Sequence, residues 1–487
     1  MAPFQTTKSG TGSFALPRCV MLLNFVRVLV FFERTLFHAV TTTHATSAFL
    51  HSLAHSLTHS LLLHPSFTHS QTVVIIFRLF TPLAYAVLLV AFLFPKLVSP
   101  EALGGSLRYH FLILVCIVEA CFFPYYYFLF TQVNQQNKKL QHFAVDKAVR
   151  LRLVRNCFEA MAAASRPGGK MQTNPDQYIR KVIEGWFLDV PILQIYRDNF
   201  ASWCGWAFFG LEISEMSESE KADNLEIVSY IETMAEWRFP PGCNKGLFSA
   251  RLTLDPVFVT QRPFFFYATI WCVNTFAHLV LYQLGYKRRP EYCTAAANVY
   301  HRPAAPRRSS PASASSDPNQ QRPPEKRPQP IVFIHGIGIG FAHYLGLLHA
   351  FPTDVDVYLL EWPHVAMQMA TDVPSVEETV DTLVRVLDDG GHPTACFVAH
   401  SLGTTAISWM LHSAAGKSRV YSTVLLDPVT FLLCDPTVAT TFVYREPTNT
   451  VDFLMHFFLS RELFISNALS RYIALRPFLV RLPVTLS

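Results

Sequence analysis

Charged residues are scarce in this chain of 487 residues. Asp, Glu, Lys and Arg make up 15% of it, whereas a soluble globular domain carries about 25%. Hydrophobic residues reach 51% and aromatic residues 14%, so the composition fits neither a plain water-soluble domain nor a disordered chain. The length allows two or three domains, and the apolar excess predicts that one of them contacts a membrane.

The chain also lacks a dense basic segment and paired cysteines. Its formal net charge is only +5 and is spread along the sequence, which argues against a nucleic-acid binder. The ten cysteines contain no CxxC pair and no regular spacing, so neither a disulfide framework nor a zinc cluster is expected, and a reducing, cytosol-facing environment is favoured. His51, His55 and His59 recur every four residues, but no carboxylate or cysteine joins them. We therefore expect no metal and no other cofactor.

Two long apolar runs follow the N-terminal region. Residues 73–94 and 111–130 are each long enough to cross a hydrocarbon core about 30 Å thick. Six basic residues follow the second run between 138 and 155, whereas the loop between the runs carries only Lys96 and Arg108. By the positive-inside rule, this pattern predicts an integral membrane protein in which residues 73–131 form a transmembrane hairpin with its C-terminal side in the cytosol.

The composition on either side of this hairpin suggests further boundaries. Residues 1–72 are of low complexity and receive no structural prediction. Residues 132–287 are mostly helical by pattern and lie next to the membrane in sequence. Residues 288–330, rich in Pro, Ser, Ala and Arg, predict a flexible, disordered linker to a separate domain at 331–487.

One segment of the helical region is itself long and apolar. Residues 263–286 are uncharged over enough residues to span a membrane. However, Asn274, His278 and Gln283 make the segment amphipathic, and a third span would move the last domain to the opposite side from the basic segment. Contact with the membrane surface is therefore favoured over a third span.

A short buried strand and a glycine-rich turn open the last domain. Residues 331–334 (IVFI) are typical of a strand buried on both faces of a parallel sheet. His335, Gly336, Gly338 and Gly340 then belong to the sequence HGIGIG. The backbone amides of such a turn can approach a ligand closely and hold a developing oxyanion. The same pattern also fits a phosphate-binding turn.

A serine follows in a second turn of a distinctive kind. Strand and helix patterns alternate after the first turn, at 355–360, 375–389 and 395–399. His400, Ser401, Leu402 and Gly403 come next and lead into the helical run TTAISWMLH, which is the strand–turn–helix context of a nucleophile elbow. Ala399 occupies the position of the motif's first glycine. Such a turn exposes the Ser401 hydroxyl above the sheet and directs the Leu402 N–H at an oxyanion. The alternative, a serine in an ordinary turn, is disfavoured by this context.

The order of these motifs resembles the α/β-hydrolase superfamily. The HGIGIG turn, the AHSLG elbow and the strand at 423–426 that ends in Asp427 follow one another as they do in that family. Residues 140–470 resemble more closely a group of fungal membrane-associated AB hydrolase-1 domain-containing proteins, and the segments 189–210 and 252–267 extend the match. The resemblance implies an α/β-hydrolase fold and a serine esterase, lipase-like in its preference for lipid esters.

A catalytic histidine is missing from the expected place. A Ser–His–acid triad needs a general base, which in this fold follows the acid. Only His412 and His456 come after Ser401; the first lies one helix away, and the second sits in an aromatic helical stretch that is typical of a packed histidine. Asp427 is either the acid, a position that some lipases use, or a cap of the turn that follows it.

The resemblance also implies two more strands, carrying an acid and then the histidine. The last residues, IALRPFLVRLPVTLS, supply at most one strand and no histidine. We therefore expect a parallel sheet that is truncated at its C-terminal end, from a truncated or mis-spliced gene.

Two functions remain open from the sequence. The first is a membrane-anchored, cytosol-facing serine hydrolase that cleaves carboxylic esters, with lipid or another ester as substrate. It forms an acyl-enzyme at Ser401 while the Ile337 and Leu402 amides hold the oxyanion. The second is a catalytically incomplete membrane protein of the same fold that binds a lipid or a partner. An acyltransferase is a weaker third, because an acyl-enzyme can pass its acyl group to an alcohol.

Overall fold

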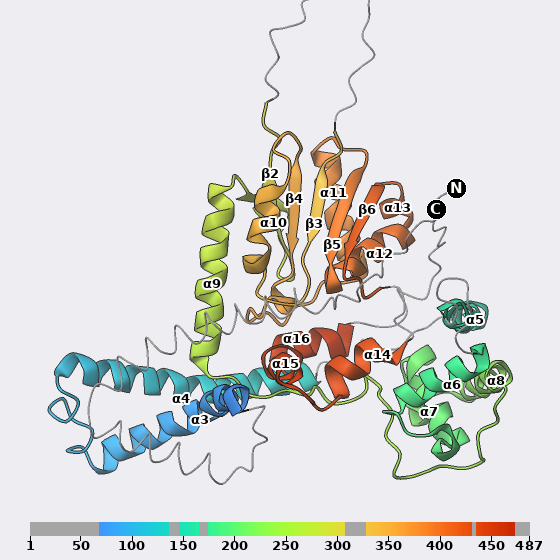
Figure 1. Cartoon of the computed structure of the whole chain (residues 1–487), viewed down its shortest axis with the longest axis horizontal. Coiled ribbons are helices and arrows are strands. Elements are labelled where there is room, and N and C mark those ends of the chain that lie inside the picture. The colour runs from blue at the N-terminus through green and yellow to red at the C-terminus, as the bar shows by residue number, and fades with distance from the viewer. Residues whose placement is uncertain (1–67, 136–145, 165–173, 307–327, 431–434, 473–487) are drawn as a thin grey trace, which may run out of the picture. The chain divides into compact units, whose positions relative to one another are not determined.

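The computed structural model describes residues 68–135, 146–164, 174–306, 328–430 and 435–472 (Figure 1). The low-complexity N-terminus with His51, His55 and His59 lies outside the described residues. The chain divides into two compact units. The first contains the chain up to Phe122 together with 263–265 and 449–453, and the second contains the remainder.

Two apolar helices dominate the first unit. α3 (Thr68–Leu93) and α4 (Ser106–Gln135, whose last turns belong to the second unit) correspond to the two predicted membrane runs. The Tyr85 hydroxyl donates to the Ala120 carbonyl at 2.7 Å, which joins the two helices. Both are long and apolar enough to cross a membrane, as is α9 (Phe264–Gln283).

An acidic residue inside α4 holds the start of α9. The Glu119 carboxylate accepts a hydrogen bond from the Thr81 hydroxyl and another from the Phe264 backbone N–H, the latter at 2.7 Å. The first N–H groups of a helix lack intrahelical acceptors, and a carboxylate at that end also interacts favourably with the helix dipole. The Phe265 ring stacks on Phe77 beside it, at a centroid separation of 4.9 Å. Glu119 thus acts as a structural cap within this unit.

Four helices of the second unit surround an aromatic core. They are α5 (Lys147–Ala164), α6 (Pro175–Trp186), α7 (Arg197–Phe209) and α8 (Glu218–Met234). Trp186, Phe200 and Trp203 pack against one another among their buried side chains.

A six-stranded mixed sheet forms the centre of the second unit (Figure 1). Its strand order is β1-β2-β4-β3-β5-β6. The four strands on one side of it are parallel: β4 (Val357–Glu361), β3 (Ile331–Ile334), β5 (Ala395–His400) and β6 (Val420–Leu426). The α/β class and the parallel strands predicted from the sequence are therefore confirmed.

The prediction of a disordered linker over 288–330 is wrong for its first part. β1 (Lys287–Arg288) and β2 (Asn298–Arg302) extend the sheet by antiparallel pairing, and Tyr300 of β2 lies opposite Leu359 of β4. The physical reason is that Val299 and Tyr300 point to opposite faces of β2 and each enters a hydrophobic core. Prolines and charges around this short strand hide that alternation in the sequence.

Helices cover both faces of the sheet. α11 (Val376–Asp389) and α12 (Thr404–His412) pack on the face to which Val332 and Ile334 point. α10 (Leu345–Ala350) and the C-terminal part of α9 pack on the other face, around Phe333. This explains why β3 is hydrophobic at every position. Four shorter helices complete the second half of the chain: α13 (Ala414–Lys417), α14 (Pro436–Ala439), α15 (Thr450–Met455) and α16 (Leu463–Asn467).

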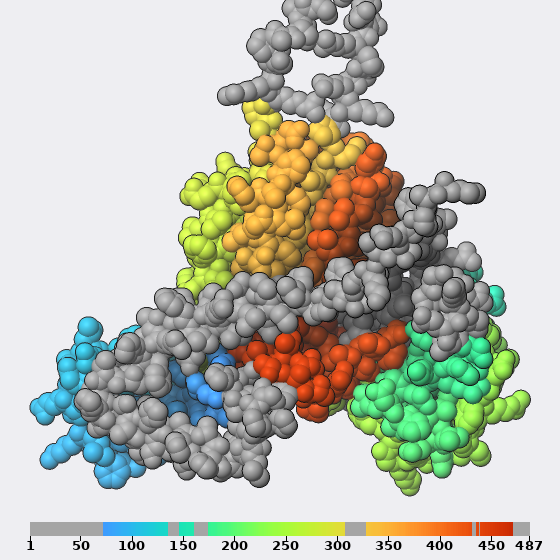
Figure 2. Space-filling model, viewed as in Figure 1, coloured from blue at the N-terminus to red at the C-terminus, as the bar shows by residue number. Residues whose placement is uncertain are grey.

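β6 is the most exposed of the four parallel strands. Within the part of the chain that the structure describes, no strand pairs with its outer edge. Tyr421 is 67% exposed and Val424 45%, although strands of a parallel sheet are normally buried on both faces. The segment that contains β6 lies at the surface of the sheet in the space-filling view, in darker orange (Figure 2). An open, apolar edge of this kind promotes pairing with another chain.

We predict that Tyr421→Lys combined with Val424→Lys reduces self-association of the full-length protein in detergent. Lysines on an edge strand oppose pairing with a second edge by charge repulsion and desolvation. Sedimentation velocity should show a smaller fraction of large species than in the wild type. Leu225→Lys, at an exposed position of α8, is the matched control and should change little. Equal effects of the two changes would contradict an edge-specific mechanism.

Candidate active site

The predicted site residues gather where the parallel strands end. β3 leads into the His335–Gly340 turn, β5 into Ser401 and β6 into Asp427. Since β3 and β5 are neighbours, with Ile334 beside Ala399, the glycine-rich turn and the serine turn lie side by side. The carboxyl edge of a parallel sheet is also where α/β proteins place their ligands.

Ser401 has an unusual backbone conformation. Its φ angle is +49°, in the left-handed region that non-glycine residues seldom adopt. The strand ends at His400, and a 3₁₀ turn over Ser401–Gly403 leads directly into α12. Hydrogen bonds from the Thr404 hydroxyl to the Ser401 carbonyl and from the Thr405 hydroxyl to the Leu402 carbonyl stabilise this junction. Ser401 thus lies, with a strained backbone, in a sharp turn between a strand and a helix.

Two glycines allow the two turns to touch. A Cβ on Gly403 would lie 2.5 Å from the His335 carbonyl oxygen, and one on Gly336 would lie 2.8 Å from the Ser401 Cβ. Neither position can hold a larger residue without moving backbone. The glycines of the two motifs therefore serve close backbone approach, as the sequence analysis expects.

The amides of the glycine-rich turn are not equivalent. The Gly336 N–H donates to the Tyr344 hydroxyl at 3.1 Å, and the Gly338 N–H donates to the Val365 carbonyl at 3.0 Å. The Ile337 N–H between them has no hydrogen-bond partner among the described residues. The Leu402 N–H lies in the first turn of a helix, where no intrahelical acceptor exists. These two N–H groups remain available for a ligand oxygen.

Tyr344 links the two motifs and was missed from the sequence. Its hydroxyl contacts His400 Nδ1 at 2.7 Å in addition to the Gly336 amide. One hydroxyl therefore bonds both the first glycine of the HGIGIG turn and the residue that precedes Ser401. A tyrosine four residues after a glycine turn has no distinctive spacing, so only the tertiary structure reveals this role.

Both ring nitrogens of His335 hydrogen-bond backbone groups. Nδ1–H donates to the Gly336 carbonyl at 2.7 Å, and Nε2 accepts from the Trp362 N–H at 2.9 Å. Burial lowers the pKa of this imidazole, which keeps the ring in the neutral form that these two bonds require. His335 thus shapes the turn and has no lone pair for a proton from Ser401.

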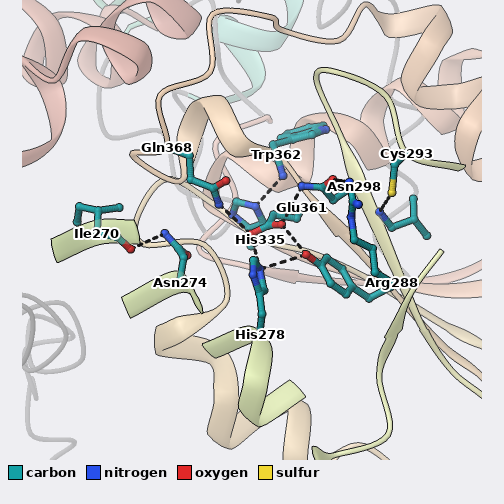
Figure 3. Close-up of polar contacts among 12 residues, drawn as sticks. Ile270, Asn274, His278, Arg288, Cys293, Asn298, His335, Glu361, Trp362 and Gln368 are labelled. Carbon is teal, nitrogen blue, oxygen red and sulfur yellow. Dashed lines mark hydrogen bonds and ion pairs between the residues drawn. The ribbon is translucent and has the colours of Figure 1, made fainter. Parts of the chain in front are cut away.

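A buried carboxylate organises the residues behind the turn (Figure 3). Glu361, at the end of β4, accepts hydrogen bonds of 3.1 Å from four side chains: His278, Asn298, Tyr300 and Gln368. Burial acts to raise the pKa of the Glu361 carboxyl, but the hydrogen bonds of His278 and Asn298 together with the neighbouring imidazoles act in the opposite direction, and the pKa is lowered overall. Glu361 therefore stays ionised and ties α9, β2 and β4 together behind Gly340. Sequence patterns gave no sign of this network.

Three further histidines contact groups other than the serine hydroxyl. His412 Nδ1 bonds the Ser408 carbonyl at 2.6 Å, and His456 Nε2 accepts from Arg461 Nε at 2.8 Å. His343 stacks on Tyr344, and burial lowers its pKa to about 3. Within the described residues no histidine hydrogen-bonds the Ser401 hydroxyl.

Asp427 is the last of the predicted site residues along the chain. Asp427 is exposed and has a φ of +50° just after β6. No group of three or more His, Cys, Asp or Glu side chains that could hold a metal occurs in the described part of the chain.

No protein-family model matches the chain, and no curated protein matches it. Similar solved structures include Smu.1393c from Streptococcus mutans, with 11% identity and a TM-score of 0.23 over 32% of this chain and 49% of that chain. Carboxylesterase CesB (YbfK) from Bacillus subtilis has 12% identity and a TM-score of 0.25, covering 42% and 70%. A membrane phospholipase A described as a bacterial virulence factor has 13% identity and a TM-score of 0.25, covering 44% and 72%. This chain thus spans about half of Smu.1393c. The strand order and the two turns define the architecture of this chain.

We predict that Gly403→Ala destabilises the protein by about 1–3 kcal/mol, the usual range for overpacking. The added methyl group would collide with the carbonyl of His335, which cannot rotate away. Gly346→Ala, in α10, is the matched control, because its Cβ meets open space and alanine favours a helix. Denaturant unfolding in detergent, followed by tryptophan fluorescence, measures both changes. Similar unfolding midpoints for the two variants would show that the turns do not pack as described.

Proposed function

We propose that the protein is a membrane-anchored serine hydrolase that cleaves carboxylic esters, with Ser401 as its nucleophile. The observation that carries this proposal is the strained, left-handed backbone of Ser401 in a strand–turn–helix junction against the glycine-rich turn. Strain of this kind persists only where the surrounding structure maintains it, and it collects at functional sites. A serine in an ordinary turn would need neither the positive φ nor the two glycine contacts.

In the proposed reaction, Ser401 Oγ attacks the acyl carbonyl and forms a tetrahedral oxyanion. The Ile337 and Leu402 N–H groups stabilise that oxygen, which fits their lack of other acceptors in the described structure. The bond to the ester oxygen then breaks, the alcohol leaves with a proton, and water releases the acyl group from the serine. His335, Gly336, Gly338, Gly340, His400 and Gly403 shape the two turns around these atoms.

We propose Asp427, at the end of β6, as the acid of the triad. Of the described histidines, His335, His400 and His412 each hydrogen-bond other groups, and His343 is too weak a base at neutral pH. Within the described residues, no histidine hydrogen-bonds the Ser401 hydroxyl. This observation favours a second candidate function, a protein of the same fold that binds a lipid or a partner without turnover.

Membrane attachment rests on the apolar helices. α3 and α4 each provide a span-length apolar segment, and the basic residues after α4 favour a cytosolic position for the chain that follows. On α9, Asn274 and His278 face the protein, whereas Trp271 and Tyr282 are exposed. Aromatic residues of this kind suit contact with lipid, and the first turn of α9 packs against α3 and α4, so we propose that α9 also contacts the membrane. A lipid-like ester is the substrate class that such a location favours.

We predict that a fluorophosphonate probe labels the full-length protein in membranes through Ser401. Labelling should disappear in Ser401→Ala, since the probe reacts only with an activated serine hydroxyl. Ser408→Ala, seven residues further along α12, is the matched control and should label like the wild type. Gel fluorescence after a fixed exposure time compares the three proteins.

Absence of labelling in every form would remove the hydrolase proposal and support the binding protein. Labelling that persists in Ser401→Ala would mean that another residue reacts with the probe. Labelling that depends on Ser401 would require a proton acceptor that the described histidines do not provide.

We predict further that Cys243 is reached only from the cytosolic side. Cys243 lies in an exposed loop and is a free cysteine. In intact cells a membrane-impermeant maleimide should spare it, and permeabilisation should allow labelling that is lost in Cys243→Ser. A cysteine introduced at Ala102, in the exposed loop between α3 and α4, should label without permeabilisation. The reverse pattern would overturn the assigned orientation.

A further inference from the structure

A small pocket lies directly beside the serine turn. Leu402, Thr405 and Trp409, from the turn and from α12, form one side of it. Trp362 and His364, which follow β4, form another, and the rest of the wall includes Ala468. Leu402 is the next residue after Ser401, so the pocket adjoins the turn that carries the serine.

Two residues of the pocket wall carry polar atoms without partners. Trp362 Nε1 and His364 Nδ1 are buried and make no hydrogen bond within the described structure. Trp362 is 2% exposed and His364 3%. A buried polar atom without a partner destabilises a fold, and most such atoms in proteins are satisfied by protein or bound water. Two such atoms in the wall of one pocket beside a reactive serine therefore point to a ligand.

The two atoms have opposite hydrogen-bonding character. An indole Nε1–H can only donate. His364 Nδ1 can accept a hydrogen bond in the neutral tautomer that carries its proton on Nε2. Burial lowers the pKa of His364 to about 3, which keeps the ring neutral and leaves Nδ1 as an acceptor. The rings of Trp362 and His364 are 5.9 Å apart between centroids.

We propose that this pocket is a subsite for a hydroxyl group of the substrate. A hydroxyl oxygen can accept from Trp362 Nε1–H while its proton is donated to His364 Nδ1, a combination that an ether oxygen or a methyl group cannot provide. The inference rests on the proposed function and deepens it. It names the substrate class as an ester that keeps a free hydroxyl close to the ester bond, such as a partial ester of a polyol.

The walls of the pocket fit the rest of such a molecule. The Trp362 and Trp409 rings lie 5.8 Å apart between centroids and offer apolar faces to the carbon atoms that carry the hydroxyl. Both polar atoms are shut off from solvent, so the hydroxyl reaches them only when the side chains of the wall shift. A pocket that opens for the right group discriminates against molecules that leave its polar atoms unpaired.

The test measures binding rather than turnover. The full-length protein in phosphatidylcholine nanodiscs is titrated with radiolabelled 1-O-hexadecylglycerol, an ether that cannot be hydrolysed, and with its 2,3-di-O-methyl derivative. Binding to empty nanodiscs is subtracted for each ligand. We expect the wild type to bind the diol at least tenfold more tightly than the dimethyl ether. Equal affinities for the two would overturn the proposal, with no need for a variant.

Two variants and a control test whether the pocket residues cause the preference for the diol. Trp362→Phe keeps an aromatic ring but removes the N–H, and His364→Phe removes the acceptor; each should reduce the preference for the diol about tenfold. Trp203→Phe is the matched control, because Trp203 Nε1 is also buried and unpartnered but lies in the helical core around α7. The control should keep the preference. A preference that survives both Trp362→Phe and His364→Phe would place the hydroxyl elsewhere and reject the subsite.

Failure of the subsite and failure of the hydrolase proposal remain distinguishable. Fluorophosphonate labelling of Ser401 is measured on the same preparations. Labelling without a preference for the diol means a hydrolase that has no hydroxyl subsite. A preference for the diol that Trp362→Phe removes, in a protein that does not label, means that the subsite exists in a protein that binds without turnover.

Discussion

The contact between two backbone turns is the constraint on which the candidate site depends. Gly403 packs against the carbonyl of His335, and Gly336 packs against Ser401, so neither turn can move without the other. This contact exists because β3 and β5 are adjacent parallel strands whose ends fall at the same level of the sheet. Strand pairing thus sets the position of the serine, and the glycines let the amide of Ile337 come near it.

Polar groups behind the turns maintain this arrangement in a water-poor environment. Glu361 satisfies side chains from α9, β2 and the loop after β4, and His335 joins the end of β4 to its own turn. Such a network stabilises only if every member has a partner. Burial lowers the pKa of His335, and the neutral ring is the form that can accept from the Trp362 N–H. Burial and hydrogen bonding therefore exclude this histidine from acid–base chemistry, although it belongs to the motif.

The sequence was informative where a structural requirement falls on adjacent residues. The hydrophobic run of β3 and the apolar face of α11 are local patterns, and the structure has both. Ser401 lies in a turn between a strand and a helix, as the local pattern predicts. β2 was missed because only two of its residues enter the core. Tyr344 and Glu361 were missed for a different reason. Their partners come from distant parts of the chain, and only the pairing of strands brings them together.

The two candidate functions differ in whether Ser401 needs a proton acceptor. An oxyanion hole and a strained serine lower the barrier for attack, but a neutral hydroxyl is a poor nucleophile until a base takes its proton. The imidazoles of His335 and His400 are bonded to other groups, and burial lowers the pKa of His343 to about 3, which makes it a weak base. Within the described residues, no strand pairs with the outer edge of β6, next to the strand that carries the serine. The positive φ of Ser401 fits the proposed hydrolase, because a binding protein would have no need for that backbone strain.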